Sequence, residues 1–159
     1  MTRREFILAA VAAIAATSAD ARDRGAAADF VRATWEREIA RHNARKPPDN
    51  DAFRALFTHE MRRLMDAPRV GISNLPDGPI IHALFGAGAL PGRTVVLRSI
   101  TTVRENAATA AVKIGLTVLD NPRDVVAVLL RQDGVWRIDD LDYGTGETLA
   151  ARYRRFTAR

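Results

Sequence analysis

The chain contains no cysteine and only two lysines, Lys46 and Lys113. The absence of cysteine excludes a disulfide scaffold, a thiolate-zinc site and a lipid anchor carried on a cysteine. Outside residues 1–21 the chain has no internal repeat and no low-complexity segment. Its 159 residues, 47% of them hydrophobic, suffice for one core and are too few for two, so we expect one ordinary globular domain.

A short apolar run opens the chain. Residues 1–21 combine a basic start, apolar residues from Phe6 to Ala16, and the small-x-small triplet that ends at Ala21. This pattern is typical of a secretory signal peptide that is cleaved after Ala21. The run is about half of the ~20 residues that span a bilayer, so a permanent anchor is the weaker interpretation. We therefore expect a signal peptide over 1–21 and one mature domain over 22–159, located in the periplasm or secreted.

The start of the chain also indicates an export route. Residues Thr2 to Ile7 resemble the twin-arginine motif, with Arg3 and Arg4 as its arginine pair, although Leu8 replaces the usual lysine. A general secretory signal with a coincidental arginine pair is the alternative. The twin-arginine route carries folded cargo, which suits a fold without cysteine, and it limits membrane contact to the passage itself. We find no cofactor-loading motif and predict no cofactor.

The formal net charge is +5, and removal of residues 1–21 takes away two basic and two acidic side chains, so it stays +5. For a periplasmic protein we expect no nucleic-acid partner, and a basic surface would meet anionic metabolites or envelope lipids. A solvated helix face accounts for the densest basic cluster, which consists of Arg152, Arg154, Arg155 and Arg159.

The first half of the mature chain has helical periodicity. Apolar residues recur at helical spacing over Asp29–Asn43 and Asp51–Ala67, with a short helix possible over Pro79–Phe85. We expect Val31, Trp35, Ile39 and His42 to form the buried stripe of the first helix.

The second half changes to a period of two, which is typical of strands. Four strands are predicted, and Asp133-Gly134 between the last two is a strong signal for a two-residue hairpin turn. We expect the strands at 94–104, 108–119, 125–132 and 135–141, followed by a helix over 147–156. Helices followed by a meander predict an α+β fold, with N-terminal helices packed on a curved, mostly antiparallel four-stranded sheet.

The segment from Asp133 to Tyr143, DGVWRIDDLDY, carries a resemblance. Together with the order of elements it looks like the nuclear transport factor 2-like superfamily, and more narrowly an exported bacterial family of unknown function within it. Trp35 stands in the aromatic place of the first helix, whereas the central loop around Gly78-Pro79-Ile80 departs from the pattern. The resemblance implies a cone-shaped fold. The superfamily holds isomerases, dehydratases and many non-catalytic ligand binders, so it does not decide the function.

Strand register suggests a first candidate site. If Arg104 pairs with Ala107, Arg98 lies opposite Lys113, and like charges placed directly opposite destabilise a strand pair. An acidic side chain, a partner subunit, a bound anion or splaying into water would relieve this repulsion. Arg98 and Lys113 are therefore a candidate anion-binding pair.

A candidate pocket follows from the last hairpin. Its register places Asp140 opposite the small Ala127, at the edge of an apolar concavity where a carboxylate could act as an acid or base. Pairing of Asp140 with an arginine, or a position beyond the rim, is the plainer alternative. The other candidate pocket residues are Trp35, His82 and Tyr143, of which His82 has the alternative role of a core histidine.

Two classes of function remain open. The first is a non-catalytic module that binds a small molecule or a periplasmic protein, and the second is a small acid-base enzyme of isomerase or dehydratase type. We favour the first, because no pair of titratable groups is brought together by the sequence pattern. We predict no metal site, since His59-Glu60 lacks the spacing of a helical metal pair. A homodimer through the open sheet face is a further expectation.

Overall fold

Residues 25–68, 83–86, 93–146 and 148–156 are described by a computed structural model of the chain. The predicted signal peptide, with Arg3, Arg4 and the cleavage position after Ala21, lies outside the described residues, and so does His82. Within the described ranges, every helix falls short of the length and apolar character needed to cross a bilayer.

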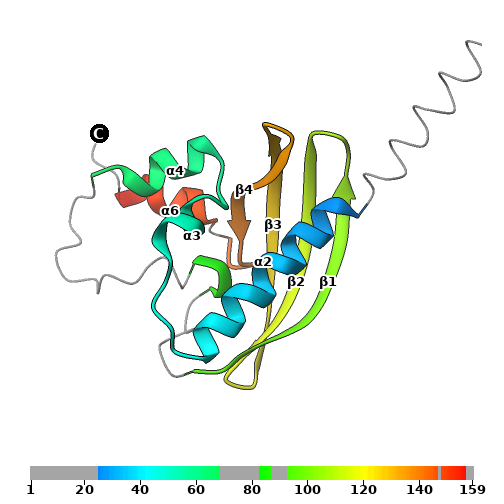
Figure 1. Ribbon diagram of the computed structural model, residues 1–159, viewed down its shortest axis with the longest axis vertical. Helices are drawn as coiled ribbons and strands as arrows, with labels where there is room; N and C mark the ends of the chain where they lie inside the picture. The colour runs from blue at the N-terminus through cyan, green and yellow to red at the C-terminus, as the bar shows by residue number, and fades with distance from the viewer. Residues whose placement is uncertain (1–24, 69–82, 87–92, 147, 157–159) are drawn as a thin grey trace, which may run out of the picture.

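The helices come first and a meander of strands follows, as predicted for an α+β fold. Figure 1 shows helix α2 along one face of a curled, unclosed antiparallel sheet of order β1-β2-β3-β4, and both views place α4 beside α6. The helices are α2 (Ala26–Asn43), α3 (Asn50–Arg54), α4 (His59–Asp66) and α6 (Leu149–Phe156). The strands are β1 (Val95–Glu105), β2 (Thr109–Val118), β3 (Asn121–Gln132) and β4 (Val135–Asp142).

The second predicted helix is two helices, so the expectation of one continuous helix was wrong. Between α3 and α4 the chain runs beside β4, where Ile138 N–H donates to the Leu56 carbonyl at 2.8 Å and Thr58 N–H donates to the Ile138 carbonyl at 2.9 Å. These bonds cover part of the free edge of β4. The helix stops there because the backbone N–H and C=O groups at the edge of a sheet need hydrogen-bond partners. A local helical periodicity does not reveal this need.

Helix α2 is anchored to β1 at both ends. The Glu105 carboxylate accepts hydrogen bonds from the backbone N–H groups of Gly25 at 3.0 Å and Ala27 at 3.1 Å. At the other end the Asn43 side chain donates to the Val95 carbonyl at 2.8 Å and accepts from the Val95 N–H at 3.0 Å. Because Glu105 supplies the N-terminal cap, α2 starts one turn before the predicted Asp29.

The β1–β2 register differs from the prediction. Two β-bulges, at Arg98 and Val103, shift the pairing, and Lys113 lies opposite Thr101 rather than Arg98. The pairing starts further from the turn than expected, with Glu105 opposite Ala110, because the Asn106 side chain accepts from two N–H groups of the loop. Each bulge inserts one residue, so counting from the turn gives the wrong partner.

The β3–β4 hairpin has the predicted turn, with Asp133 and Gly134 at φ 53° and 76°. Three predicted pairs next to it are confirmed: Gln132–Val135, Arg131–Trp136 and Leu129–Ile138. A bulge at Asp139 then places Asp140 opposite Val128, and the expected pairing with Ala127 was wrong.

The β2–β3 turn consists of Leu119 and Asp120, both at positive φ, 49° and 62°. This tight turn starts β3 at Asn121, four residues before the predicted start. Pro122 is tolerated there because it pairs with Thr117 of β2 on one side, whereas β4 pairs with β3 only from Val126 onward.

Replacing Leu119-Asp120 by Asn-Gly should raise the free energy of unfolding by about 1 kcal/mol, because asparagine and glycine adopt positive φ with less strain than leucine and aspartate. Denaturant unfolding measures the change. Asp133→Asn is the matched control, since its turn already contains glycine, and it should leave stability unchanged. Equal stability of the Asn-Gly variant and the wild type would contradict the turn conformation.

Candidate functional site

Trp35 lies in the core and is fully buried, with an exposed fraction of 0%. Its indole Nε1 has no acceptor among the described residues. A buried N–H without an acceptor is costly, so this position is unusual for a helix that only packs against a sheet.

Asp140 holds the start of α6. Its Oδ1 accepts from the backbone N–H of Leu141 at 2.8 Å and from that of Ala150 at 2.9 Å. Ala150 is the second residue of α6, so the carboxylate satisfies one of the N–H groups that a helix leaves unpaired at its start. This contact gives Asp140 a structural role.

Tyr143 fastens the segment Ala83–Gly86 to the sheet. Its hydroxyl donates to the Ala83 carbonyl. Its ring packs on Gly86, which adopts φ 73° and where a Cβ would lie 3.3 Å from the ring. Burial raises the pKa of the Tyr143 phenol above its ordinary value.

The raised pKa of Tyr143 makes the free energy of unfolding depend on pH in the alkaline range. The phenol ionises near pH 10 in the unfolded chain and at higher pH in the folded one, so the folded state keeps a proton that the unfolded state loses. Stability is therefore lost as pH rises above 10, by up to about 1.4 kcal/mol per pH unit. Tyr143→Phe should remove this part of the dependence, at a cost near neutral pH of about 1 kcal/mol. Denaturant unfolding of both proteins from pH 8 to 12 measures the difference, and parallel curves would contradict it.

Both members of the candidate anion-binding pair, Arg98 and Lys113, contact an acidic side chain. Lys113 Nζ lies 2.7 Å from Asp124 Oδ2, and Arg98 Nη2 lies 3.6 Å from Asp124 Oδ1. The guanidinium of Arg98 also donates from Nε to the Leu116 carbonyl at 3.0 Å. Asp124 thus occupies the place between the two cations. The three side chains are about half exposed, so the pairing contributes little to stability.

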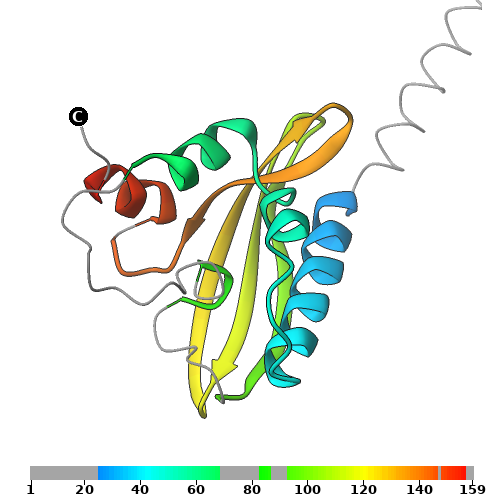
Figure 2. The same ribbon diagram turned by 60° about the vertical axis from the view of Figure 1, so that its left-hand side comes forward.

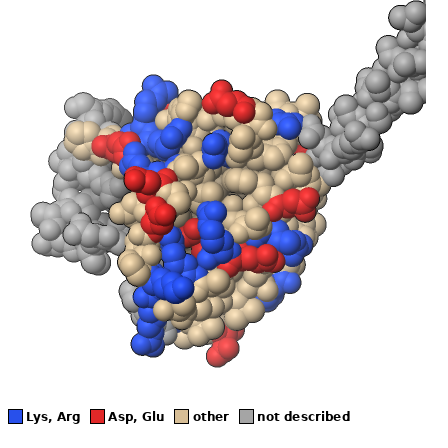
Figure 3. Space-filling model, viewed as in Figure 1, with Lys and Arg blue, Asp and Glu red and all other residues tan. Residues whose placement is uncertain are grey.

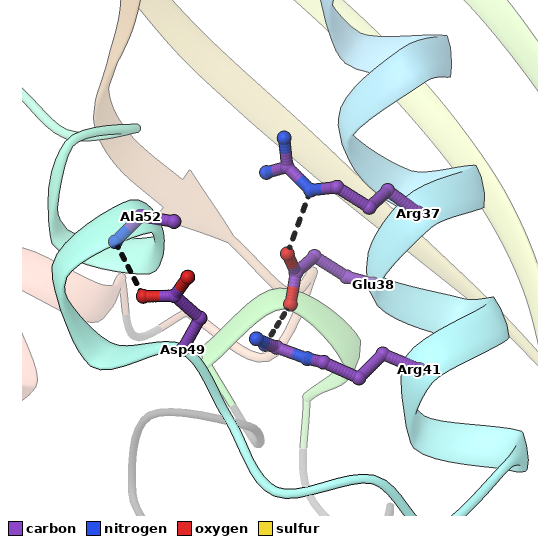
Figure 4. A network of polar contacts seen from close by, with 5 residues as sticks. All are labelled: Arg37, Glu38, Arg41, Asp49 and Ala52. Carbon is purple, nitrogen blue, oxygen red and sulfur yellow. Dashed lines mark hydrogen bonds and ion pairs between the residues drawn. The ribbon is translucent and has the colours of Figure 1, made fainter.

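The buried face of α2 carries polar residues besides the predicted His42, and the sequence pattern missed Thr34 and Glu38. Thr34, Glu38 and His42 are all buried there, with Glu38 only 5% exposed. The Glu38 carboxylate is paired with Arg37, whose Nε lies 3.1 Å away, and with Arg41 one turn later. Figure 4 shows the side chains of Arg37, Glu38 and Arg41 extending from α2 toward Asp49 at the start of α3. The close spacing of Arg37, Glu38 and Arg41 in the sequence was the available signal.

These polar residues border a crevice at the C-terminal end of α2. His42 Nε2 lies 2.8 Å from the Arg93 carbonyl, which only accepts, so this nitrogen carries the proton. The ring of His42 meets the ring of Phe85 edge-on, with centroids 5.5 Å apart. The crevice has a volume of about 10 Å³, roughly the room for one water molecule. It is lined by Glu38, Arg41, His42, Lys46, Phe53, Leu84 and Phe85.

The surface charges are mixed. Figure 3 shows basic and acidic side chains interspersed on the face that it presents. Among the described residues, ion pairs join Arg54 to Asp66 and Arg63 to Glu60. Helix α6 differs, because it carries Arg152, Arg154 and Arg155 and no acidic residue.

Comparison of the chain with protein-family models, curated proteins and solved structures found no match.

Proposed function

We propose that the chain is an exported, non-catalytic binding module with a cone-shaped fold of the nuclear transport factor 2-like kind. The basic start, short apolar run and small-x-small triplet of residues 1–21 support export to the periplasm or beyond. The curled sheet with α2 along one face is compatible with a cone, and the hairpin that ends in DGVWRIDDLDY supports the superfamily.

One observation favours binding over catalysis. The two polar side chains of the candidate pocket that the structure describes are both engaged with backbone groups: Asp140 accepts from Leu141 and Ala150, and Tyr143 donates to Ala83. A general acid or base must reach the substrate with a free lone pair or proton. The Tyr143 hydroxyl donates its only proton to the Ala83 carbonyl, and Asp140 Oδ1 is fixed at the start of α6, which favours a structural role for both.

Incubation with a metabolite extract tests the proposal that the chain is non-catalytic. The mature protein, residues 22–159, and its Asp140→Asn and Tyr143→Phe variants are each mixed with a cell extract. The metabolites are followed by chromatography coupled to mass spectrometry, because an isomerisation leaves the mass unchanged. We expect no metabolite to be consumed by the wild type. A metabolite that the wild type converts and either variant does not would support the isomerase or dehydratase alternative. It would overturn the proposal of a non-catalytic module.

The export route is tested on the full chain. We expect the exported protein to begin at Arg22, and the Arg3→Lys, Arg4→Lys double variant to remain in the cell as precursor. Fractionation and N-terminal sequencing measure both. Export of the double variant at the wild-type level would indicate the general secretory route, and retention of the wild type would overturn export.

Self-association through the sheet face that bears Arg98 stays a prediction. Arg98 is partly exposed and lies over the sheet, so a charge of opposite sign there would disturb a partner that packs on it. Light scattering of the wild type and Arg98→Glu measures the mass. A dimer that Arg98→Glu dissociates would support the interface, and a wild-type monomer would exclude it.

A further inference from the structure

The C-terminal half of α2 buries groups that an ordinary core would exclude. Glu38 is 5% exposed, His42 is 8% exposed, and the indole N–H of Trp35 has no acceptor among the described residues. Burial of polar and charged groups costs free energy unless each finds a partner. Glu38 has partners in Arg37 and Arg41. His42 has one in the Arg93 carbonyl, whereas the Trp35 N–H has none within the described ranges. Glu38 and His42 thus form a polar wall of the crevice that they line.

That wall is covered by the chain's own apolar side chains. Leu84 and Phe85, each 1% exposed, insert beside Phe53 and His42. They come from a segment whose described part, Ala83–Gly86, is held to the sheet by the Tyr143 hydroxyl. The aromatic ring of Phe85 therefore fills the apolar space next to the polar wall.

The rim of the same crevice is cationic. Arg41 and Lys46 line it together with Phe85. The carboxylate of Glu38, which also lines the crevice, compensates one of these two positive charges and fixes the guanidinium of Arg41. A net positive rim beside an apolar interior is complementary to a molecule with an apolar body and a carboxylate.

We infer that this crevice is the entrance to a binding site for an apolar carboxylate, in which the ligand takes the place of the Phe85 ring and its carboxylate meets Arg41 and Lys46. This inference rests on the proposed binding function and names the class of ligand. Glu38 is a positioning residue, because it acts through Arg41. Since Phe85 must leave before the ligand enters, the apparent affinity of the wild type is reduced by the small fraction of open protein.

Phenylacetate and its neutral analogue phenylacetamide are the probes, added to the mature protein and followed by NMR titration. We expect phenylacetate to bind more tightly than phenylacetamide. Lys46→Glu should weaken phenylacetate about tenfold and leave phenylacetamide unchanged. The matched control is Lys113→Glu, which changes the only other lysine, located on the sheet beside Asp124, and should have no effect.

Removal of the Phe85 ring tests whether the ligand takes the place of that ring. Phe85→Ala should bind phenylacetate at least tenfold more tightly than the wild type, because the ligand no longer displaces a side chain. Leu129→Ala opens a space in the core among residues that do not line the crevice, and should show no preference for the carboxylate. Phe85→Leu keeps the core more nearly filled and should give a smaller gain of the same kind, so it replaces Phe85→Ala if alanine prevents folding.

Three outcomes would overturn the inference: no binding of phenylacetate to the wild type and Phe85 variants, equal affinity for the charged and neutral probes, or equal effects of Lys46→Glu and Lys113→Glu. In each case the crevice is not a carboxylate site. Conversion of a metabolite would overturn the non-catalytic proposal whatever the result with phenylacetate, so the two failures are distinguishable.

Discussion

Replacing Phe85 by alanine should lower the free energy of unfolding by about 3–5 kcal/mol. The ring is 1% exposed and contacts the imidazole of His42, so alanine would leave a cavity beside two buried polar groups, Glu38 and His42. The segment would keep the buried Leu84 side chain and the hydrogen bond from Tyr143 to Ala83, of which the hydrogen bond contributes only about 1 kcal/mol. Denaturant unfolding followed by tryptophan fluorescence measures the loss.

Two further variants separate packing from a general effect of substitution. Phe85→Leu should cost less than Phe85→Ala, about 1–2 kcal/mol, because leucine retains most of the apolar contact. Val135→Ala changes a side chain that is 45% exposed and should stay within about 0.5 kcal/mol of the wild type. A loss below about 1 kcal/mol for Phe85→Ala would show that this segment does not complete the core.

Replacing Thr58 by valine should lower the free energy of unfolding by about 2–3 kcal/mol, although the two side chains have nearly the same shape. Thr58 is fully buried, and its hydroxyl makes two bonds: it donates to Asp139 Oδ1 at 2.9 Å and accepts from the Met61 N–H at 3.2 Å. Valine removes the N-terminal cap of α4, a loss of about 1 kcal/mol. It also leaves the half-buried Asp139 carboxylate without this donor, which adds about 1–2 kcal/mol.

Thr58→Ser is the matched control, because serine keeps the hydroxyl and loses only a methyl group. It should retain at least half of the stability that valine loses, as measured by the same unfolding experiment. If serine and valine destabilise the protein equally, the loss comes from packing and the two hydrogen bonds contribute nothing measurable.

The order of elements could be read from the sequence because it depends on local patterns. A period of two over the second half predicts strands, and Asp133-Gly134 fixes the last turn and the three pairs next to it. The register is lost beyond the bulges at Arg98, Val103 and Asp139. A bulge forms where tertiary contacts demand it, as where Thr58 donates to Asp139, and the strand's own sequence carries no mark of it.

The candidate site was predictable only in part. Tyr143 packs against the core and Asp140 is half-buried, and each is engaged by a backbone partner that the hairpin pattern does not reveal, Ala83 and Ala150. The buried Glu38 went unnoticed because a helical stripe is identified by its apolar members, and a carboxylate is expected to face solvent. Its burial depends on the cations of Arg37 and Arg41 beside it.

The double attachment of α2 to β1 bears on synthesis. The partners of its two ends lie far along the chain, separated by 80 residues between Gly25 and Glu105 and by 52 residues between Asn43 and Val95. A nascent polypeptide that ends before β1 has neither partner, so the helix translated first is secured only after the ribosome has completed the strand that holds it. We expect chains truncated before residue 95 to be readily digested by protease.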